Sequence, residues 1–133
     1  MRALVCGSRT FSDEWIVHRV LDGIYDHEHA WNNPVVIIEG GAKGADALAE
    51  SWVAGHGTEY PHPHEQYPAD WTRHGKAAGH IRNQRMLDDG RPDVVFAFVD
   101  KPLAESRGTA DMVRRARAAG VPVHVVTAGG VAS

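Results

Sequence analysis

Short apolar runs alternate with longer amphipathic segments along this chain of 133 residues. A run of four to seven mostly apolar residues is typical of a strand that is buried on both faces of a sheet. Four such runs and one polar segment with two prolines predict five strands, at residues 3–6, 35–38, 58–63, 93–99 and 121–126. The prolines restrict the third strand to a sheet edge, because proline has no N–H to donate.

Between the strands, apolar residues recur with the spacing of a helix that has one face in the core. Ile16, Val20 and Ile24 form such a stripe, and Ser12 is the predicted cap of this first helix. The other predicted helices run from residue 45 to about 55, from about 76 to 89, and from a Thr109 cap to about 119. Residues 64–80 predict a long loop in which the third of these helices starts.

This alternation predicts an α/β fold in which helices cover both faces of a five-stranded parallel sheet. The third and fifth strands resemble edge strands, since Pro122 lies near the start of the fifth. Right-handed crossovers then favour the strand order 3-2-1-4-5. Because no linker or internal repeat divides the chain, we expect a single domain at residues 1–127 and a flexible tail at 128–133.

Three glycines in five residues follow the second strand, in the segment IEGGAKGAD at residues 38–46. Clustered glycines usually serve positive φ angles or a close approach to the backbone. Because this loop leads into a helix, its N–H groups and the positive end of that helix are placed to face a phosphate. The loop matches neither GxGxxG nor GxxxxGK[ST], so simple turn chemistry stays an alternative.

In the predicted order the topology switches between strands 1 and 4, where open α/β sheets bind their ligands. Four polar loops meet there, at residues 7–9, 39–46, 67–83 and 106–109. Ser8 offers a hydroxyl and Arg9 a forked cation that suits phosphate or carboxylate. The predicted ligand-binding residues are Gly7, Ser8, Arg9, Gly40, Gly41, Lys43, Gly44, Asp46, Arg82, Asn83, Ser106, Gly108 and Thr109.

Several of these side chains have a plain structural interpretation as well. Asp46 either complements the positive start of a helix or accepts a hydrogen bond from a sugar hydroxyl. Arg9 and Arg82 have surface ion pairs as an alternative interpretation. Tyr67 and Trp71 either stack on a base or pack locally.

Composition narrows the function classes. A net charge of −3 argues against a dedicated duplex-DNA binder, and no apolar run approaches the roughly 20 residues that cross a bilayer. The single cysteine, Cys6, suits a reducing compartment, and we expect a cytoplasmic protein. The nine histidines occur without HExxH or CxxC, so we expect neither a metal site nor a cofactor.

Four ordered motifs resemble a known family: GSRTF, EGGAKGAD, YPADWTRHGKAAGHIRNQRM and SRGTADMV. Together they resemble the SLOG superfamily, and most closely its YspA-like, cpYpsA-related group. The resemblance spans nearly the whole chain. It implies a Rossmann-like three-layer α/β/α domain that binds nucleotides or nucleotide-derived signals, with members linked to phages, actinobacteria and antiviral conflict.

The same superfamily contains the LOG phosphoribohydrolases, which cleave the base from a nucleoside monophosphate and carry the motif PGGxGTxxE. Gly108 and Thr109 match the GT of that motif, and Arg82 resembles its arginine. Met112 stands at the glutamate position, and Asp111, one residue earlier, points about 100° away around a helix. The proline and double glycine are replaced by residues 105–107.

We therefore expect a protein that binds a nucleotide or an ADP-ribose-like ligand, as a sensor or sequestering protein. The alternative is an N-glycosidic hydrolase in the same site, with Glu39, Asp46 or Asp111 as the carboxylate and Arg82 beside it. A DNA-processing accessory protein is a third alternative, which the acidic balance disfavours. A homodimer is open as well, since Trp15, Trp31 and Trp52 either supply an apolar surface or belong to the core.

Overall fold

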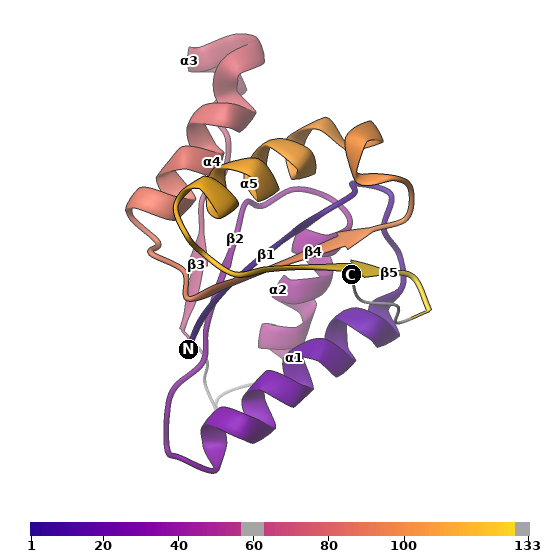
Figure 1. The fold of residues 1–133 in the computed structure, drawn as a ribbon, viewed down its shortest axis with the longest axis vertical. Coiled ribbons are helices and arrows are strands. Elements are labelled where there is room, and N and C mark those ends of the chain that lie inside the picture. Colours follow the sequence, from indigo (N-terminus) through magenta and orange to yellow (C-terminus); the bar gives the residue numbers. More distant parts are fainter. Residues whose placement is uncertain (57–62, 130–133) are drawn as a thin grey trace.

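The computed structural model describes residues 1–56 and 63–129. Five strands form one sheet in the order β3-β2-β1-β4-β5, and every neighbouring pair is parallel (Figure 1). The strands are β1 (Arg2–Gly7), β2 (Val36–Glu39), β3 (His64–Gln66), β4 (Val94–Val99) and β5 (Val123–Thr127). The predicted order 3-2-1-4-5 is confirmed, and the fold is of the Rossmann-like α/β class.

Helices lie on both faces of this sheet (Figure 1). The helices are α1 (Glu14–His29), α2 (Ala45–His56), α3 (Trp71–His74), α4 (Ala78–Asp88) and α5 (Arg107–Ala118). Short 3₁₀ turns, η1 (Gly75–Ala77) and η2 (Leu103–Glu105), precede α4 and α5. In the view of Figure 1, α4 and α5 cover the upper face of the sheet, and α1 and α2 cover the lower face.

The central strand β1 supplies side chains to two cores, because successive residues of a strand point to opposite faces. Ala3 and Val5 pack in the cluster of α1 and α2, whereas Leu4 and Cys6 pack in the cluster of α4 and α5. All four are buried. A strand buried on both faces cannot alternate apolar with polar residues, which is why β1 is a continuous apolar run.

The third strand lies later than predicted. Residues 58–62 of the predicted strand are outside the described residues, and β3 occupies His64–Gln66, inside the predicted loop. Its three residues are polar, two of them partly buried and Gln66 exposed, and they pair with Ile37, Ile38 and Glu39. An edge strand this short needs no apolar pattern, because backbone pairing with β2 and polar side-chain contacts, such as the Arg2–Glu65 ion pair at 2.8 Å, hold it. The same predicted loop also contains α3.

Two predicted helix caps are corrected. Asp13, not Ser12, is the N-cap of α1, where its carboxylate accepts a hydrogen bond from the N–H of Ile16 at 3.2 Å. Helix α5 begins at Arg107, so Ser106 occupies its cap position and Thr109 lies buried in the first turn. The predicted tail overlaps the described part of the chain only at residues 128 and 129, which form a turn.

The tryptophans divide between core and surface. Trp52 is buried, and its indole N–H donates to Asp22 Oδ1 at 2.9 Å, so it belongs to the core. Trp15 and Trp31 are 64% and 71% exposed. The homodimer that these residues suggest stays a prediction. Within the described ranges, none of the helices is both long and apolar enough to span a bilayer.

Candidate functional site

A pocket of about 380 Å³ opens at the carboxyl edge of the sheet, between the end of β1, helix α4 and the N-terminus of α5. This edge is where parallel α/β sheets usually bind ligands. The predicted ligand residues that line it are Gly7, Ser8, Arg9, Asp46, Arg82, Asn83, Ser106, Gly108 and Thr109. The predicted residues Gly40, Gly41, Lys43 and Gly44 are not among its lining residues.

The amides of the glycine loop are occupied by carboxylates of the same chain. Asp46 Oδ2 accepts hydrogen bonds from the N–H of Gly40 at 3.0 Å and of Ala42 at 3.2 Å. Glu39 Oε1 accepts one from the N–H of Gly41 at 2.7 Å. A phosphate would have to displace these carboxylates in order to bind the same three N–H groups.

The glycines of this loop permit close contacts within the protein. Gly44 has a φ of +77°, and a Cβ at this position would collide with the Ser8 carbonyl oxygen. A Cβ at Gly40 would collide with the Arg82 guanidinium. These two positions therefore favour glycine because other atoms approach the backbone closely, as predicted. The approaching atoms belong to the protein itself, namely the backbone of Ser8 and the side chain of Arg82.

The first turn of α5 forms the opposite wall of the pocket. Ser106 stands at the cap position without a side-chain cap bond to the helix, and its Oγ lies 3.0 Å from the Ser8 Oγ. The first N–H groups of a helix have no intrahelical partner. Arg107, Gly108 and Thr109, which carry these N–H groups, all line the pocket. The arrangement is able to bind an anion through backbone donors at the positive end of a helix.

Charged side chains around the pocket are mainly cationic. Four cations line it, and two carboxylic residues stand against them: Arg9, Arg82, Lys101 and Arg107, with Asp46 and Glu105. Lys101 and Arg107 were not among the predicted ligand residues, although Lys101 lies in the polar segment between β4 and α5 and Arg107 follows the predicted Ser106 as the first residue of α5. Both could have been predicted, because basic residues in and next to the loop that follows a central strand indicate an anion site.

Acidic and basic side chains are distributed unevenly between the two helical layers. Six acidic residues and one arginine lie on α1 and α2: Glu14, Asp22, Asp26, Glu28, Asp46, Glu50 and Arg19. Six arginines and two aspartates lie on α4 and α5: Arg82, Arg85, Arg107, Arg114, Arg115, Arg117, Asp88 and Asp111. The side of the pocket formed by α4 and α5 therefore belongs to a basic layer, whereas Asp46 of the acidic layer lines the side toward α2.

Arg82 and Arg9 differ in how firmly they are held. Arg82 donates from Nη1 to the Gly40 carbonyl oxygen at 2.6 Å and from Nε to Asn83 Oδ1 at 3.0 Å. Arg9 is exposed, and its guanidinium lies 5.7 Å from the ring centroid of Trp71. Arg82 is thus fixed beside the glycine loop, whereas Arg9 lies at the solvent side of the pocket.

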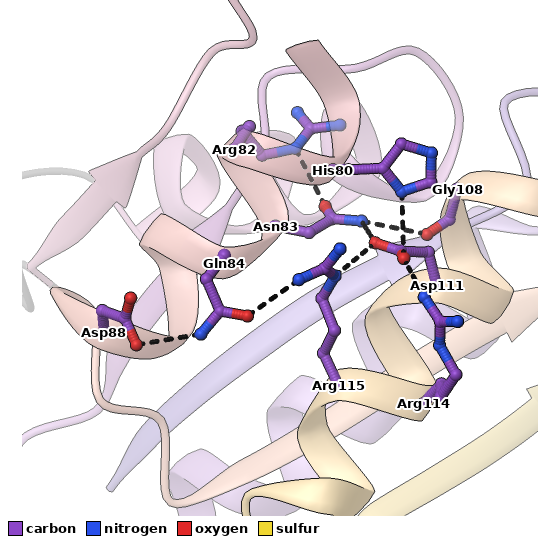
Figure 2. A network of polar contacts seen from close by, with 9 residues as sticks. All are labelled: His80, Arg82, Asn83, Gln84, Asp88, Gly108, Asp111, Arg114 and Arg115. Carbon is purple, nitrogen blue, oxygen red and sulfur yellow. Dashed lines mark hydrogen bonds and ion pairs between the residues drawn. The ribbon is translucent and has the colours of Figure 1, made fainter. Parts of the chain in front are cut away.

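Asp111 lies outside the pocket, in a network between α4 and α5 (Figure 2). Its carboxylate accepts hydrogen bonds from Asn83 Nδ2 at 3.0 Å and Arg115 Nε at 2.8 Å, and it contacts His80 and Arg114. Burial alone raises the pKa of Asp111, but the bonds from Arg115, Asn83 and His80 outweigh it and lower the pKa to about 2. Met112, at the position of the LOG glutamate, is buried in the core.

The other two candidate carboxylates stand near the loop. Burial raises the pKa of Asp46 to about 6, with repulsion from Glu39 as the second cause. Burial also raises the pKa of Glu39, against hydrogen bonds from Gln66 and the Gly41 N–H. Of the three predicted catalytic carboxylates, Asp46 is the one that lines the pocket.

The remaining sequence candidates have local partners. Tyr67 donates from its hydroxyl to Glu65 at 3.0 Å, whereas Trp71 is half exposed beside Arg9. Cys6 borders the pocket, and burial raises the pKa of its thiol, which keeps it protonated at neutral pH. Across residues 1–56 and 63–129, no group of three or more His, Cys, Asp or Glu side chains is placed to hold a metal ion.

Comparison with known proteins supports the resemblance drawn from the motifs. The chain is 40% identical over 123 residues to the Gene 61 protein of Mycobacterium phage D29, a match that covers 92% of this chain and 93% of that protein. No solved structure matches the chain significantly. Residues 1–74, which hold β1, the glycine loop and the Asp46 carboxylate, match the family described as YspA, cpYpsA-related SLOG. Since that match covers more than half of the chain, this protein belongs to the YspA, cpYpsA-related SLOG family.

Proposed function

We propose that this protein binds a nucleotide or a nucleotide-derived, ADP-ribose-like ligand in the pocket at the carboxyl edge of the sheet. The observation that carries the proposal is the first turn of α5, which lines this pocket among cationic side chains and receives no side-chain cap from Ser106. Membership of a SLOG family points in the same direction, because it suggests nucleotide-related binding or processing.

The phosphate of such a ligand binds the N–H groups of Arg107, Gly108 and Thr109. Backbone donors at a helix N-terminus are a common phosphate site, and the helix dipole favours the negative charge. Arg9, Lys101 and Arg107 neutralise the phosphate from the pocket wall. The glycine-loop amides are a less favourable phosphate site, because Glu39 and Asp46 already satisfy three of them.

The sugar and base occupy the part of the pocket toward α2. Asp46 reaches a sugar hydroxyl there, and Arg82 closes the side next to Gly40. The volume of about 380 Å³ falls in the usual range for small-molecule sites, roughly 300–1,000 Å³. Trp71, beside Arg9 at the solvent side, stacks on a base that projects from the pocket.

The biological role that fits this chemistry is a sensor or a sequestering protein for a nucleotide signal. The relative from Mycobacterium phage D29 places a similar chain in a phage. A protein that binds the signal without consuming it needs a phosphate cradle, here the N–H groups of residues 107–109, and an aromatic surface for the base, here Trp71. It needs no catalytic carboxylate.

The experiment that tests the binding site uses Gly108, because a side chain there meets nothing within 4 Å. Gly108→Asp places a carboxylate in the phosphate cradle, and an acid in the first turn does not destabilise a helix. Gly108→Asn is the matched neutral control. We expect calorimetric titration with AMP and ADP-ribose to show loss of binding in Gly108→Asp and substantial retention in Gly108→Asn. Equal affinities in the wild-type protein and Gly108→Asp would exclude the cradle.

Hydrolysis of an N-glycosidic bond is the second candidate, and Asp46 is the reason to keep it. A carboxyl group with a pKa of about 6 can both hold and release a proton near neutral pH, as a general acid–base residue must. Incubation with AMP, NAD and ADP-ribose followed by chromatography distinguishes the two functions. Released base that disappears in Asp46→Asn would favour the hydrolase, and unchanged nucleotide would favour the binding protein.

DNA processing is tested by filter binding of single- and double-stranded oligonucleotides at physiological salt. The basic layer of α4 and α5 is the surface that a nucleic acid would contact, despite the acidic net charge. We expect no retained strand. Retention that falls steeply with added salt would indicate a nucleic-acid partner.

A further inference from the structure

We propose that Asp111 is a positioning residue for the ligand pocket, which acts through Asn83 on Arg82. The inference rests on the proposed nucleotide function, because it assigns a task to residues of that same site. Asp111 itself is not among the lining residues of the pocket, whereas Asn83, Arg82 and Gly108 are. Figure 2 shows the four residues together with the arginines and the histidine around Asp111.

The orientation of the Asn83 amide is set by two acceptors. Asn83 Nδ2 donates to Asp111 Oδ2 at 3.0 Å and to the Gly108 carbonyl oxygen at 3.1 Å. Both acceptors require the NH₂ group, and the reversed amide would bring its oxygen against a carboxylate and a carbonyl. Asp111 and Gly108 therefore leave the amide oxygen of Asn83 on the side of Arg82.

The amide oxygen then fixes the arginine. Asn83 Oδ1 accepts from Arg82 Nε at 3.0 Å, while Arg82 Nη1 donates to the Gly40 carbonyl oxygen at 2.6 Å. A guanidinium held at two of its nitrogens has little freedom to turn into solvent. Its charge is thus placed before a ligand arrives, which lowers the ordering cost of binding.

The same contacts connect the cation to the phosphate cradle. Asn83 is buried and holds Gly108, in the first turn of α5, as well as Arg82 on α4. Asp111 is buried too, and its charge is balanced by Arg114 and Arg115. A buried carboxylate with these partners stays ionised at neutral pH and remains a constant acceptor for Asn83. Asp111 thereby keeps the Asn83 amide oxygen directed at Arg82.

The test is a double-mutant cycle on Asp111 and Arg82, with AMP and ADP-ribose as probes. Asp111→Asn removes the negative charge at similar volume and leaves one acceptor oxygen in place of two, for which Asn83 and Arg115 compete. We expect about tenfold weaker binding, as for the weakening of one hydrogen bond to a charged group. In an Arg82→Ala background the same substitution has no further effect, because Asp111 acts through Arg82. Additive losses of affinity would overturn the proposal.

Gln84→Ala is the matched control. It removes the Arg115 Nη1 bond at 2.9 Å and the bond to Asp88 at 3.0 Å from the same network, and it leaves Asn83 and Arg82 untouched. We expect unchanged affinity in this variant. A loss equal to that of Asp111→Asn would mean that the network acts only by joining α4 to α5, and would overturn the positioning role.

A readout without ligand separates this inference from the proposed function. The Arg82 Nε–H resonance, assigned by its absence in Arg82→Lys, is expected to shift and to exchange faster with solvent in Asp111→Asn. An unchanged resonance overturns the positioning role, whatever the wild-type protein binds. A shifted resonance in a protein that binds neither AMP nor ADP-ribose supports positioning and contradicts the nucleotide function.

Discussion

The guanidinium of Arg82 lies against the backbone of Gly40, with Nη1 2.6 Å from the Gly40 carbonyl oxygen. A Cβ at Gly40 would collide with that side chain and, among its nearest neighbours, with nothing else. The two residues are 42 positions apart in the sequence. Their contact joins the glycine loop to α4 at the edge of the pocket.

Gly40→Ala is therefore expected to displace the arginine without unfolding the protein. The clashing atoms belong to the end of a flexible side chain, and Gly40 is not among the glycines with positive φ. We expect the midpoint of thermal unfolding to change by only a few degrees, as for about 1 kcal/mol, and the affinity for AMP or ADP-ribose to fall. Gly55→Ala on α2, where a Cβ meets nothing within 4 Å, is the control. Unchanged affinity in Gly40→Ala would separate Arg82 from the ligand.

Gly44→Ala is expected to lower the free energy of unfolding. Gly44 has a φ of +77°, and a Cβ there would meet the backbone of Ser8 and Arg9, which cannot move aside as a side chain does. Gly120 has a nearly equal φ of +78° with open space around it, so Gly120→Ala measures the cost of the backbone conformation alone. We expect about 1–2 kcal/mol for Gly120→Ala and at least about 1 kcal/mol more for Gly44→Ala, from urea unfolding. Equal losses would mean that the close approach to Ser8 has no energetic consequence.

The ionisation of Asp46 predicts a fall in stability with rising pH. Its pKa is about 6 in the folded protein against 3.8 without the fold, so the folded state binds the proton more tightly. The contribution is fully present below about pH 4 and is lost as the pH rises to about 6. Over that window we expect the stability of the wild-type protein to fall, relative to Asp46→Asn, by about 2–3 kcal/mol.

Urea unfolding at pH 4, 5, 6 and 7 provides the measurement for both proteins. Glu39, whose pKa is also raised, adds a decline of the same sign that Asp46→Asn retains. Asp111 acts in the opposite direction, since its lowered pKa makes stability fall only as the pH drops below about 4. Parallel curves for the two proteins from pH 4 to pH 7 would show that Asp46 has an ordinary pKa.

Trp71 provides an optical test of base stacking. It is 51% exposed and lies beside Arg9, so a base that stacks there is expected to quench its fluorescence. Trp71→Phe should remove the quenching that AMP causes, while Trp31→Phe, at a position 71% exposed beyond the end of α1, should retain it. Quenching that persists in Trp71→Phe would place the base elsewhere.

Local sequence patterns predicted the fold because the run of apolar residues in a strand indicates directly whether its two faces are buried. The apolar runs of β1 and β4 require cover on both faces, which made an all-parallel sheet with two helical layers the expected arrangement. The prolines placed the third strand at an edge, but its position at His64–Gln66 was missed. Three polar residues carry no periodic apolar signal, because backbone pairing with β2 and polar contacts such as the Arg2–Glu65 ion pair hold them.

Local sequence patterns predicted the location of the candidate site but not the contacts within it. Ser8, Arg9, Arg82 and the Gly108 segment were predicted to meet at one edge, and the strand order brings them to one pocket. The glycine loop was predicted as a phosphate site, and the structure shows that Glu39 and Asp46 occupy three of its amides. A glycine pattern reveals that something approaches the backbone, and only the folded chain reveals which atoms do.

The sequence by itself determined the architecture, the family and the sheet edge at which function is expected, because strand burial and loop composition are properties of contiguous residues. Tertiary structure decided which carboxylates are paired and which face the pocket: Asp111 is enclosed by α4 and α5, and Asp46 is left at the wall. It also separated an acidic layer from a basic one. Hydrogen bonds and charges act through space, so residues far apart in the chain set their energies.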